Sequence, residues 1–295
     1  MPASRRTVLA AAAASALAGC TGPASVASSG RTASAPPNPV IRSGTSWSHV
    51  PPAVPPAAAS IPTRAQIVAD YGHLRPHTWG FGGPEMLRAL PVAQRVIALT
   101  FDACGGPGGS GYDQSLIDFL RRREVPATLF LNSRWIDANP AAFRRLAGEP
   151  LFEIANHGTR HLPLSVTGRS AYGIAGTRNA GEVYDEVAGN QVKLTRLLGV
   201  PPRFFRSGTA YCDDIAARIV TALGERFVSF SVNGDGGATF APEQVRAAVT
   251  AARDGSIVIG HMNHPERGTA LGIAAAVPYL LASGYRFVRL SDELS

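Results

Sequence analysis

Two histidines that lie four residues apart are the strongest chemical signal in this chain of 295 residues. His157 and His161 stand in the sequence His-Gly-Thr-Arg-His, directly after an apolar run. On a helical turn, side chains four residues apart share one face and lie about 5 to 6 Å apart at Cβ. Neutral imidazole is a common ligand of divalent metals, so the pair predicts a metal site. A purely structural, hydrogen-bonded pair is the alternative.

Asp102 and His261 each end another apolar run. A carboxylate at a strand end is poorly placed for a core, and we interpret Asp102 as a general base that takes a proton from water. We interpret His261 as the acid that protonates a leaving group. A strand-end cap and a structural histidine are the respective alternatives. Arg206, late in a further run, would orient a carboxylate such as Asp102 or bind substrate.

The elements that must position these residues follow from the hydrophobic pattern. Short apolar, β-branched runs alternate with helical patterns, which is typical of a parallel sheet covered on both faces. The candidate residues stand at the C-terminal ends of several runs, as on the upper face of a (β/α) barrel. We therefore predict an α/β fold, a (β/α) barrel with about seven parallel strands. The expected strands are residues 96–102, 127–132, 152–156, 204–208, 227–233, 256–261 and 286–290, and the clearest helices are 113–123, 180–198, 213–223 and 242–253.

The first 63 residues have the features of an export signal followed by a spacer. A charged start is followed by 12 apolar residues, too few to span a bilayer, so residues 1–19 are expected to be a signal peptide. Its Arg5-Arg6 pair resembles a twin-arginine signal, and the sequence ending at Cys20 resembles a lipobox. We expect export and lipid anchoring through Cys20 to the outer face of the cell membrane. We expect residues 20–63 to be a disordered Ala/Ser/Pro-rich linker. Residues 64–92 are expected to be an N-terminal extension of the domain, and residues 93–295 are expected to form the barrel.

Charge and glycine spacing argue against two classes of ligand. The net charge is +7, but residues 1–63 hold four arginines and no acid, which leaves 24 basic and 21 acidic groups in the rest of the chain. No nucleic-acid partner is expected from so balanced a domain. The glycine-rich stretch 105–111 lacks both the spacing of a dinucleotide-binding loop and the lysine of a P-loop, so nucleotide binding is not predicted.

Several short motifs together resemble one known family. They are Thr100-Phe101-Asp102, His157-Gly-Thr-Arg-His161, Arg206, Asn233-Gly-Asp235 and Ile259-Gly260-His261. In order and rough spacing they are similar to the motifs of the polysaccharide deacetylases, carbohydrate esterase family 4, over about residues 93 to 291. The resemblance implies a distorted (β/α) barrel with seven or eight strands. It also implies hydrolysis of N- or O-acetyl groups on chitin-like polymers, peptidoglycan or xylan.

The resemblance assigns roles to the candidate residues. It implies that His157 and His161 bind zinc or another divalent ion, that Asp102 is the base and that His261 is the acid. We accordingly expect a metal-dependent, monomeric hydrolase that removes acetyl groups from a cell-envelope or extracellular glycan. Two alternatives stay open: a non-catalytic glycan-binding lipoprotein with a degenerate barrel, and an amidase that acts on a small molecule.

The chain departs from the family pattern at the metal site. The family usually has a second aspartate, a metal ligand, where this chain has Ala103, whose Cβ we therefore expect to face the metal. We take Asp102 itself as the third ligand, with Cys104 as an alternative. Asp113 is a further candidate, although the N-cap of the following helix is its favoured role. Cys104 could instead form a disulfide with Cys212 or remain a free thiol.

Two further departures concern the substrate cleft. Arg206-Ser-Gly-Thr209 replaces the family's Arg-x-Pro-Tyr, which removes one wall of the groove and carries over only the arginine. Asn233 stands where an aspartate is common, and Asp235 is expected to tune His261 in its place.

Overall fold

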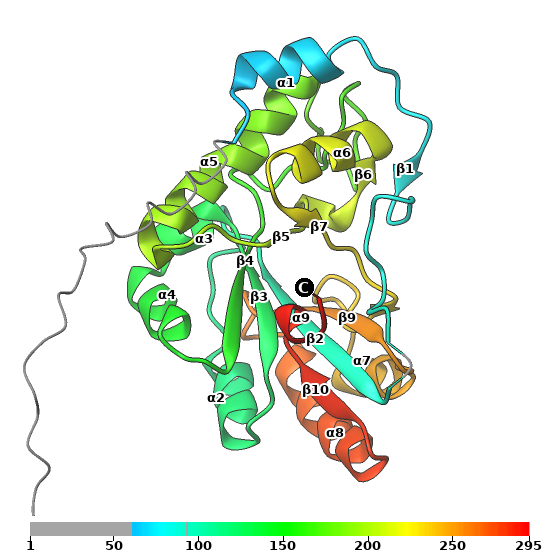
Figure 1. Ribbon diagram of the computed structural model, residues 1–295. Coiled ribbons are helices and arrows are strands. Elements are labelled where there is room, and N and C mark those ends of the chain that lie inside the picture. Colours follow the sequence, from blue (N-terminus) through cyan, green and yellow to red (C-terminus); the bar gives the residue numbers. More distant parts are fainter. Residues whose placement is uncertain (1–60, 93, 295) are drawn as a thin grey trace, which may run out of the picture. The chain divides into compact units, whose positions relative to one another are not determined.

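Eight parallel strands form the central sheet of the computed structural model, which describes residues 61–92 and 94–294 (Figure 1). They are β2 (Val96–Ala103), β3 (Ala127–Leu131), β4 (Phe152–Asn156), β5 (Phe204–Phe205), β7 (Arg226–Phe227), β8 (Val232–Asn233), β9 (Ser256–His261) and β10 (Arg286–Val288). Their order is β7-β5-β4-β3-β2-β9-β8, and β10 pairs with the first half of β2. Two short strands, β1 (Trp79–Gly80) and β6 (Cys212–Asp213), pair separately and antiparallel.

Helices cover the outside of the curled sheet (Figure 1). The predicted distorted (β/α) barrel is therefore confirmed, and the four helices expected from the sequence all form to within a few residues. The helices are α1 (Arg64–Tyr71), α2 (Gln114–Arg122), α3 (Ser133–Ala138), α4 (Pro140–Ala147), α5 (Ala180–Leu198), α6 (Asp214–Ala222), α7 (Pro242–Thr250), α8 (Thr269–Ala282) and α9 (Leu290–Glu293). None of these helices within the described ranges is long and apolar enough to cross a membrane.

The central strand β2 is buried along its whole length, with its two faces in different cores. Leu99 and Phe101 pack in the cluster that includes side chains of α2 and α8. Ala98 belongs to the inner cluster together with Phe130. Because successive side chains of a strand point to opposite faces, Asp102 follows Ala98 toward the inside of the barrel.

The strand predicted at residues 227–233 is interrupted and becomes β7 and β8. The interruption coincides with two backbone carbonyls that accept hydrogen bonds from the Arg206 side chain. Nε donates to the Val228 carbonyl at 3.2 Å and Nη2 donates to the Ser229 carbonyl at 3.0 Å. Because residues 227–233 give two strands, the sheet has eight strands where about seven were expected.

The segment before the first sheet strand belongs to the barrel wall. Leu87 forms a parallel bridge with Val228, next to β7, and Ala89 forms an antiparallel bridge with Ser256, the first residue of β9. Residues 87–89 therefore connect the two sides of the sheet between β7 and β9. In Figure 1 this segment is the cyan stretch of coil that runs down from β1 beside the sheet.

Candidate active site and metal centre

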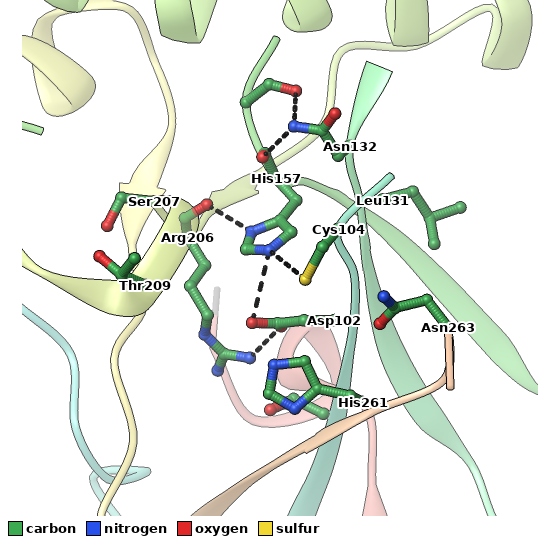
Figure 2. A network of polar contacts seen from close by, with 12 residues as sticks. Asp102, Cys104, Leu131, Asn132, His157, Arg206, Ser207, Thr209, His261 and Asn263 are labelled. Atoms are coloured by element: carbon green, nitrogen blue, oxygen red, sulfur yellow. Dashed lines mark hydrogen bonds and ion pairs between the residues drawn. The ribbon is translucent and has the colours of Figure 1, made fainter. Parts of the chain in front are cut away.

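A cleft of about 330 Å³ opens at the C-terminal ends of the sheet strands. Asp102, His161 and His261 line it, as the sequence motifs predicted. His157 and Arg206 are fully buried and contact Asp102 from within the barrel. Figure 2 shows Asp102, His157, Arg206 and His261 converging from separate strands and loops. The sequence candidates therefore form one site.

The two predicted metal-binding histidines lie on a loop, and the expectation of a helical turn is wrong. The loop folds back because Gly158 has φ 78° and His161 has φ 64°, both in the left-handed region. The two imidazole rings nevertheless meet edge to face, with centroids 4.9 Å apart. A loop thus brings the two rings together without a helical turn.

A buried glutamate of α5 fixes this loop. The Glu186 carboxylate accepts backbone N–H groups of Arg160, at 3.0 Å, and Leu162, at 3.1 Å. Asn132 adds a second support by donating to the carbonyl of His157 at 2.9 Å. The sequence motifs did not identify Glu186. Its signal was a carboxylate on the apolar face of a helix, four residues before the buried Asn190.

The tautomer of His157 is set by a backbone group. Its Nδ1 lies 2.8 Å from the carbonyl of Arg206, which can only accept, so Nδ1 carries the proton and Nε2 keeps its lone pair. Nε2 lies 3.9 Å from Cys104 Sγ and 3.6 Å from Asp102 Oδ2. This is the arrangement of an imidazole held as a metal ligand, with its other nitrogen oriented by an acceptor.

Three possible metal ligands lie close together: the donor atoms of Cys104, His157 and His161 are all within 4.8 Å of one another. Within the described residues, no other three His, Cys, Asp or Glu side chains form such a group. Asp102, expected as third ligand, is outside this group. Its Oδ1 is held 2.7 Å from Arg206 Nη1. The structure therefore brings the alternative candidate Cys104 to both histidines.

The surroundings of Cys104 favour its ligating form. Burial raises the pKa of its thiol, but the neighbouring His161 and His157 imidazoles lower that pKa more, and the net pKa is well below the usual value. The pKa of His157 is shifted in the opposite direction: burial lowers it, whereas Asp102 and Cys104 raise it above its ordinary value. Since the thiolate is the form that binds metals, Cys104 suits a metal site.

Arg206 positions the candidate base. Its side chain is fully buried, stacks over the Phe130 ring at 4.1 Å and donates to Asp102 Oδ1. Arg206 has no exposed surface, so its contacts favour the expected role of orienting Asp102 over the alternative of binding substrate. Removing one partner of such a buried ion pair typically costs about 3–5 kcal/mol of stability.

His261 and Asp235 form a hydrogen-bonded pair on the other side of the cleft. Asp235 accepts from His261 Nδ1 at 3.0 Å and from the backbone N–H of His261 at 2.7 Å, and it also accepts from Thr269 Oγ1 at 2.9 Å. Burial lowers the pKa of His261, but Asp235 outweighs burial and the net pKa is well above its usual value. The expectation that Asp235 takes over the tuning of His261 from Asn233 agrees with these contacts.

Three alternatives from the sequence are resolved by packing. Ala103 points away from the cleft into the cluster with Leu116, so the expectation that its Cβ faces the metal is wrong. Asp113 caps α2, where its carboxylate accepts the N–H of Leu116 at 3.0 Å. Cys104 and Cys212 are both free, so the disulfide is not formed.

The loop that replaces the family's third motif needs its glycine. A Cβ on Gly208 would collide with the backbone carbonyl group of His161. The two residues after Gly208 both have positive φ, 70° for Thr209 and 59° for Ala210. A bulkier loop at this point would displace the histidine loop, so the absence of a side chain at Gly208 allows the two loops to touch.

A second buried carboxylate beneath the site leads to a prediction on stability. Glu225 Oε1 accepts from Asn156 at 2.9 Å, whereas Oε2 has no hydrogen-bond partner among the described residues. Burial raises the pKa of Glu225 well above its ordinary value. The folded state thus holds a proton that the unfolded chain releases, and wild-type stability must fall as pH rises from the unfolded pKa toward the folded one.

Glu225→Gln keeps the hydrogen bond from Asn156 and removes this dependence. At neutral pH we expect the variant to unfold with a free energy about 1 to 3 kcal/mol higher than wild type, the typical cost of an unsatisfied buried polar group. Urea unfolding at several pH values between 4.5 and 8 measures the difference, which should grow with pH. Glu243→Gln on the exposed side of α7 is the control and should change nothing. A wild-type curve parallel to that of Glu225→Gln would contradict the prediction.

The part of the chain that carries this site is similar in sequence to known proteins. The sequence profile of the polysaccharide deacetylases matches residues 89–228, a range that includes Asp102, both histidines of the loop and Arg206. Over this range the chain is similar to the polysaccharide deacetylases. This confirms the resemblance noted from the short motifs.

Curated relatives of this chain are named deacetylases, which are hydrolases. A peptidoglycan-N-acetylglucosamine deacetylase from Bacillus cereus is 27% identical over 213 residues, which are 70% of this chain and 91% of that enzyme. The chain spans only 30% and 41% of two other curated relatives, which are longer proteins.

Solved structures of the family share the fold. A family 4 carbohydrate esterase pseudoenzyme from Bacillus anthracis matches with a TM-score of 0.60 and 19% identity, over 72% of this chain and 70% of that one. A family 4 acetyl xylan esterase from Clostridium thermocellum, solved in complex with a cobalt ion, matches with a TM-score of 0.55 and 24% identity, over 67% of this chain and 89% of that one.

Proposed function

We propose that this protein is a metal-dependent hydrolase that removes acetyl groups from an acetylated glycan of the cell envelope. One observation carries the proposal: a cluster of metal-donor atoms, a buried carboxylate and an imidazole–carboxylate pair surround a single cleft. Similarity to the polysaccharide deacetylases over residues 89–228 supports the same reaction.

The three donor side chains fit a divalent ion, and we propose that this ion is zinc. Cys104 Sγ and His157 Nε2 are 3.9 Å apart, and an ion about 2.0 to 2.3 Å from each donor fits between them. Thiolate and imidazole together suit zinc. We assign Cys104, His157 and His161 as its protein ligands. A metal bound there would polarise the acetyl carbonyl and lower the pKa of a nearby water.

The remaining residues divide the proton transfers between them. Asp102, held by Arg206, accepts a proton from the attacking water. His261, oriented by Asp235, donates a proton to the leaving amine nitrogen as the bond from that nitrogen to the acetyl carbon breaks. Water thus adds across the amide, giving acetate and a free amine on the sugar. Since Asp102 is outside the ligand group, one residue does not have to serve as both ligand and base.

The second candidate function, a non-catalytic glycan-binding lipoprotein, has one observation in its favour. The B. anthracis neighbour is described as a pseudoenzyme, although a mutant of it has restored enzymatic activity. Asp102 and His261 argue for catalysis here, because a binding module needs neither. Metal analysis of the purified protein, combined with acetate release from acetylated peptidoglycan, chitin oligomers and xylan, distinguishes the two functions. Full metal occupancy without acetate release from any substrate would favour binding alone.

We also propose that the mature protein is exported and held at the outer face of the membrane through Cys20, which lies outside the described residues. The relative from B. cereus is named for peptidoglycan, a polymer of that compartment. Cys20→Ser is expected to move the protein from the membrane fraction to the soluble or secreted fraction, since the acyl anchor is lost. Fractionation followed by immunoblotting measures this. An unchanged distribution would refute lipidation at Cys20.

A further inference from the structure

Five aromatic side chains form a continuous cluster, the aromatic wall, beside the cleft. Tyr211 is its centre: ring centroids lie 5.5 Å away at Trp79, 4.4 Å at Phe81 and 5.5 Å at Tyr172. Phe230 extends the row, 5.2 Å from Phe81. Of these, Phe81, Tyr172 and Phe230 line the cleft itself. The wall therefore presents ring surface to whatever enters the site.

Tyr172 is the least expected member of the wall. Its side chain is 72% exposed, and its backbone has φ 52° in a tight turn closed by Ala171 and Ile174. A large aromatic residue with positive φ is uncommon, and such backbone strain concentrates at ligand-binding positions. The turn holds an exposed ring at the edge of the cleft, where folding alone gives it no role.

The segment that carries Trp79 and Phe81 is firmly attached. Strand β1 pairs with β6, and the Asp214 carboxylate accepts the backbone N–H groups of His77, at 2.8 Å, and Thr78, at 2.9 Å. Rings held in this way lose little conformational freedom when a ligand binds, which favours affinity.

The cleft also has polar lining residues. They are Asp102, His161, His261 and Asn233. A pyranose ring matches such a cleft, because its two faces carry C–H bonds and its edge carries hydroxyl groups. The apolar face of the pyranose ring can lie on the aromatic wall while its hydroxyl groups bind the polar lining residues.

We propose that the aromatic wall is a sugar-binding subsite that stacks a pyranose ring next to the one being deacetylated. The proposal rests on the proposed function and makes it narrower: the substrate is a glycan of at least two rings, and a small amide is excluded. The third motif of this chain, around Gly208, has lost the aromatic residue that walls the groove in the family pattern. Trp79 and Phe81, from the segment before the barrel, and Tyr172, from a distant loop, would replace it.

The test measures binding separately from turnover. Isothermal titration calorimetry compares the N-acetylglucosamine tetramer with the monomer. The tetramer should bind wild type at least tenfold more tightly. Tyr172→Ala and Phe81→Ala should each weaken tetramer binding by about threefold to tenfold, the worth of one aromatic contact. Tyr172→Phe keeps the ring and should bind like wild type. Tyr279→Ala, on the exposed side of α8, is the matched control.

A second measurement separates a subsite from a merely structural role. Hydrolysis of a small aryl acetate needs no neighbouring sugar, so Tyr172→Ala should lower kcat/KM for the tetramer about threefold to tenfold more than it lowers the rate with the aryl acetate. Equal binding of monomer and tetramer, or full tetramer affinity in Tyr172→Ala, would overturn the subsite. If wild type instead binds the tetramer through the wall but releases no acetate from any substrate, the proposed function fails and the subsite stands.

Discussion

Cobalt(II) titrated into the metal-free protein is expected to produce an intense near-ultraviolet absorption band, because the Cys104 thiolate would be one of its ligands. Charge transfer from sulfur to cobalt gives such a band, whereas a site of two imidazoles and a carboxylate gives none. The expectation follows from the donor group of Cys104, His157 and His161 and from the lowered pKa of the thiol. The measurement reports on ligation without any assumption about turnover.

Variants at Cys104 make the test quantitative. Cys104→Ala should abolish the band and weaken metal affinity by at least about 100-fold, because loss of a direct ligand exceeds the usual effect of losing a hydrogen-bond partner of one. Cys104→Asp should bind cobalt without the band, since a carboxylate then replaces the thiolate. Cys212→Ala and Cys20→Ser are the controls and should retain the band. A band that persists in Cys104→Ala would show that sulfur from elsewhere is bound and would refute the ligand assignment.

The second large effect concerns the proton-transfer residues. His261→Ala and Asp102→Asn should each lower kcat for acetate release by about 10²- to 10⁴-fold, the range of general acid–base catalysis. Cobalt affinity should stay within a few-fold of wild type, because neither residue belongs to the donor group. His157→Ala and His161→Ala, in contrast, should lose both metal and turnover.

The comparison of the four variants decides the roles. Thermal unfolding followed by circular dichroism serves as the control for folding, which matters most for Asp102 because Arg206 is paired with it. If Asp102→Asn lost metal as completely as His157→Ala, Asp102 would be a ligand after all. If all four variants lost metal equally, the division between ligands and proton-transfer groups would be wrong.

The arrangement of strands and helices could be predicted because strands buried on both faces appear as apolar runs, and each run carries its polar residue at one end. Strand alternation also predicts the direction of the Ala103 side chain. If Asp102 faces the barrel interior, the next side chain must face the helices. The same alternation places Cys104, two residues after Asp102, on the inner side, and the chain then turns at Gly105 and Gly106, with φ of 69° and 80°.

Other features had no local signal in the sequence. The positive φ of His161 is imposed by contacts from a distant helix, in which Glu186 accepts the N–H groups of the loop. The aromatic wall joins Trp79 to Tyr172 through Tyr211, so its members are separated by tens of residues in the chain. Pairings of this kind depend on the closure of the whole barrel, and hydrophobic periodicity does not encode them.

The bridges of Leu87 to Val228 and of Ala89 to Ser256 have a practical consequence for aggregation. They occupy hydrogen-bonding groups beside β7 and at the start of β9, which β8 does not reach, and without them these groups would face solvent as open sheet edges. An unpaired edge is a template on which a second chain can add a strand. A protein shortened to begin at residue 93 would therefore be prone to associate with copies of itself through these two edges, even with every proposed catalytic residue in place.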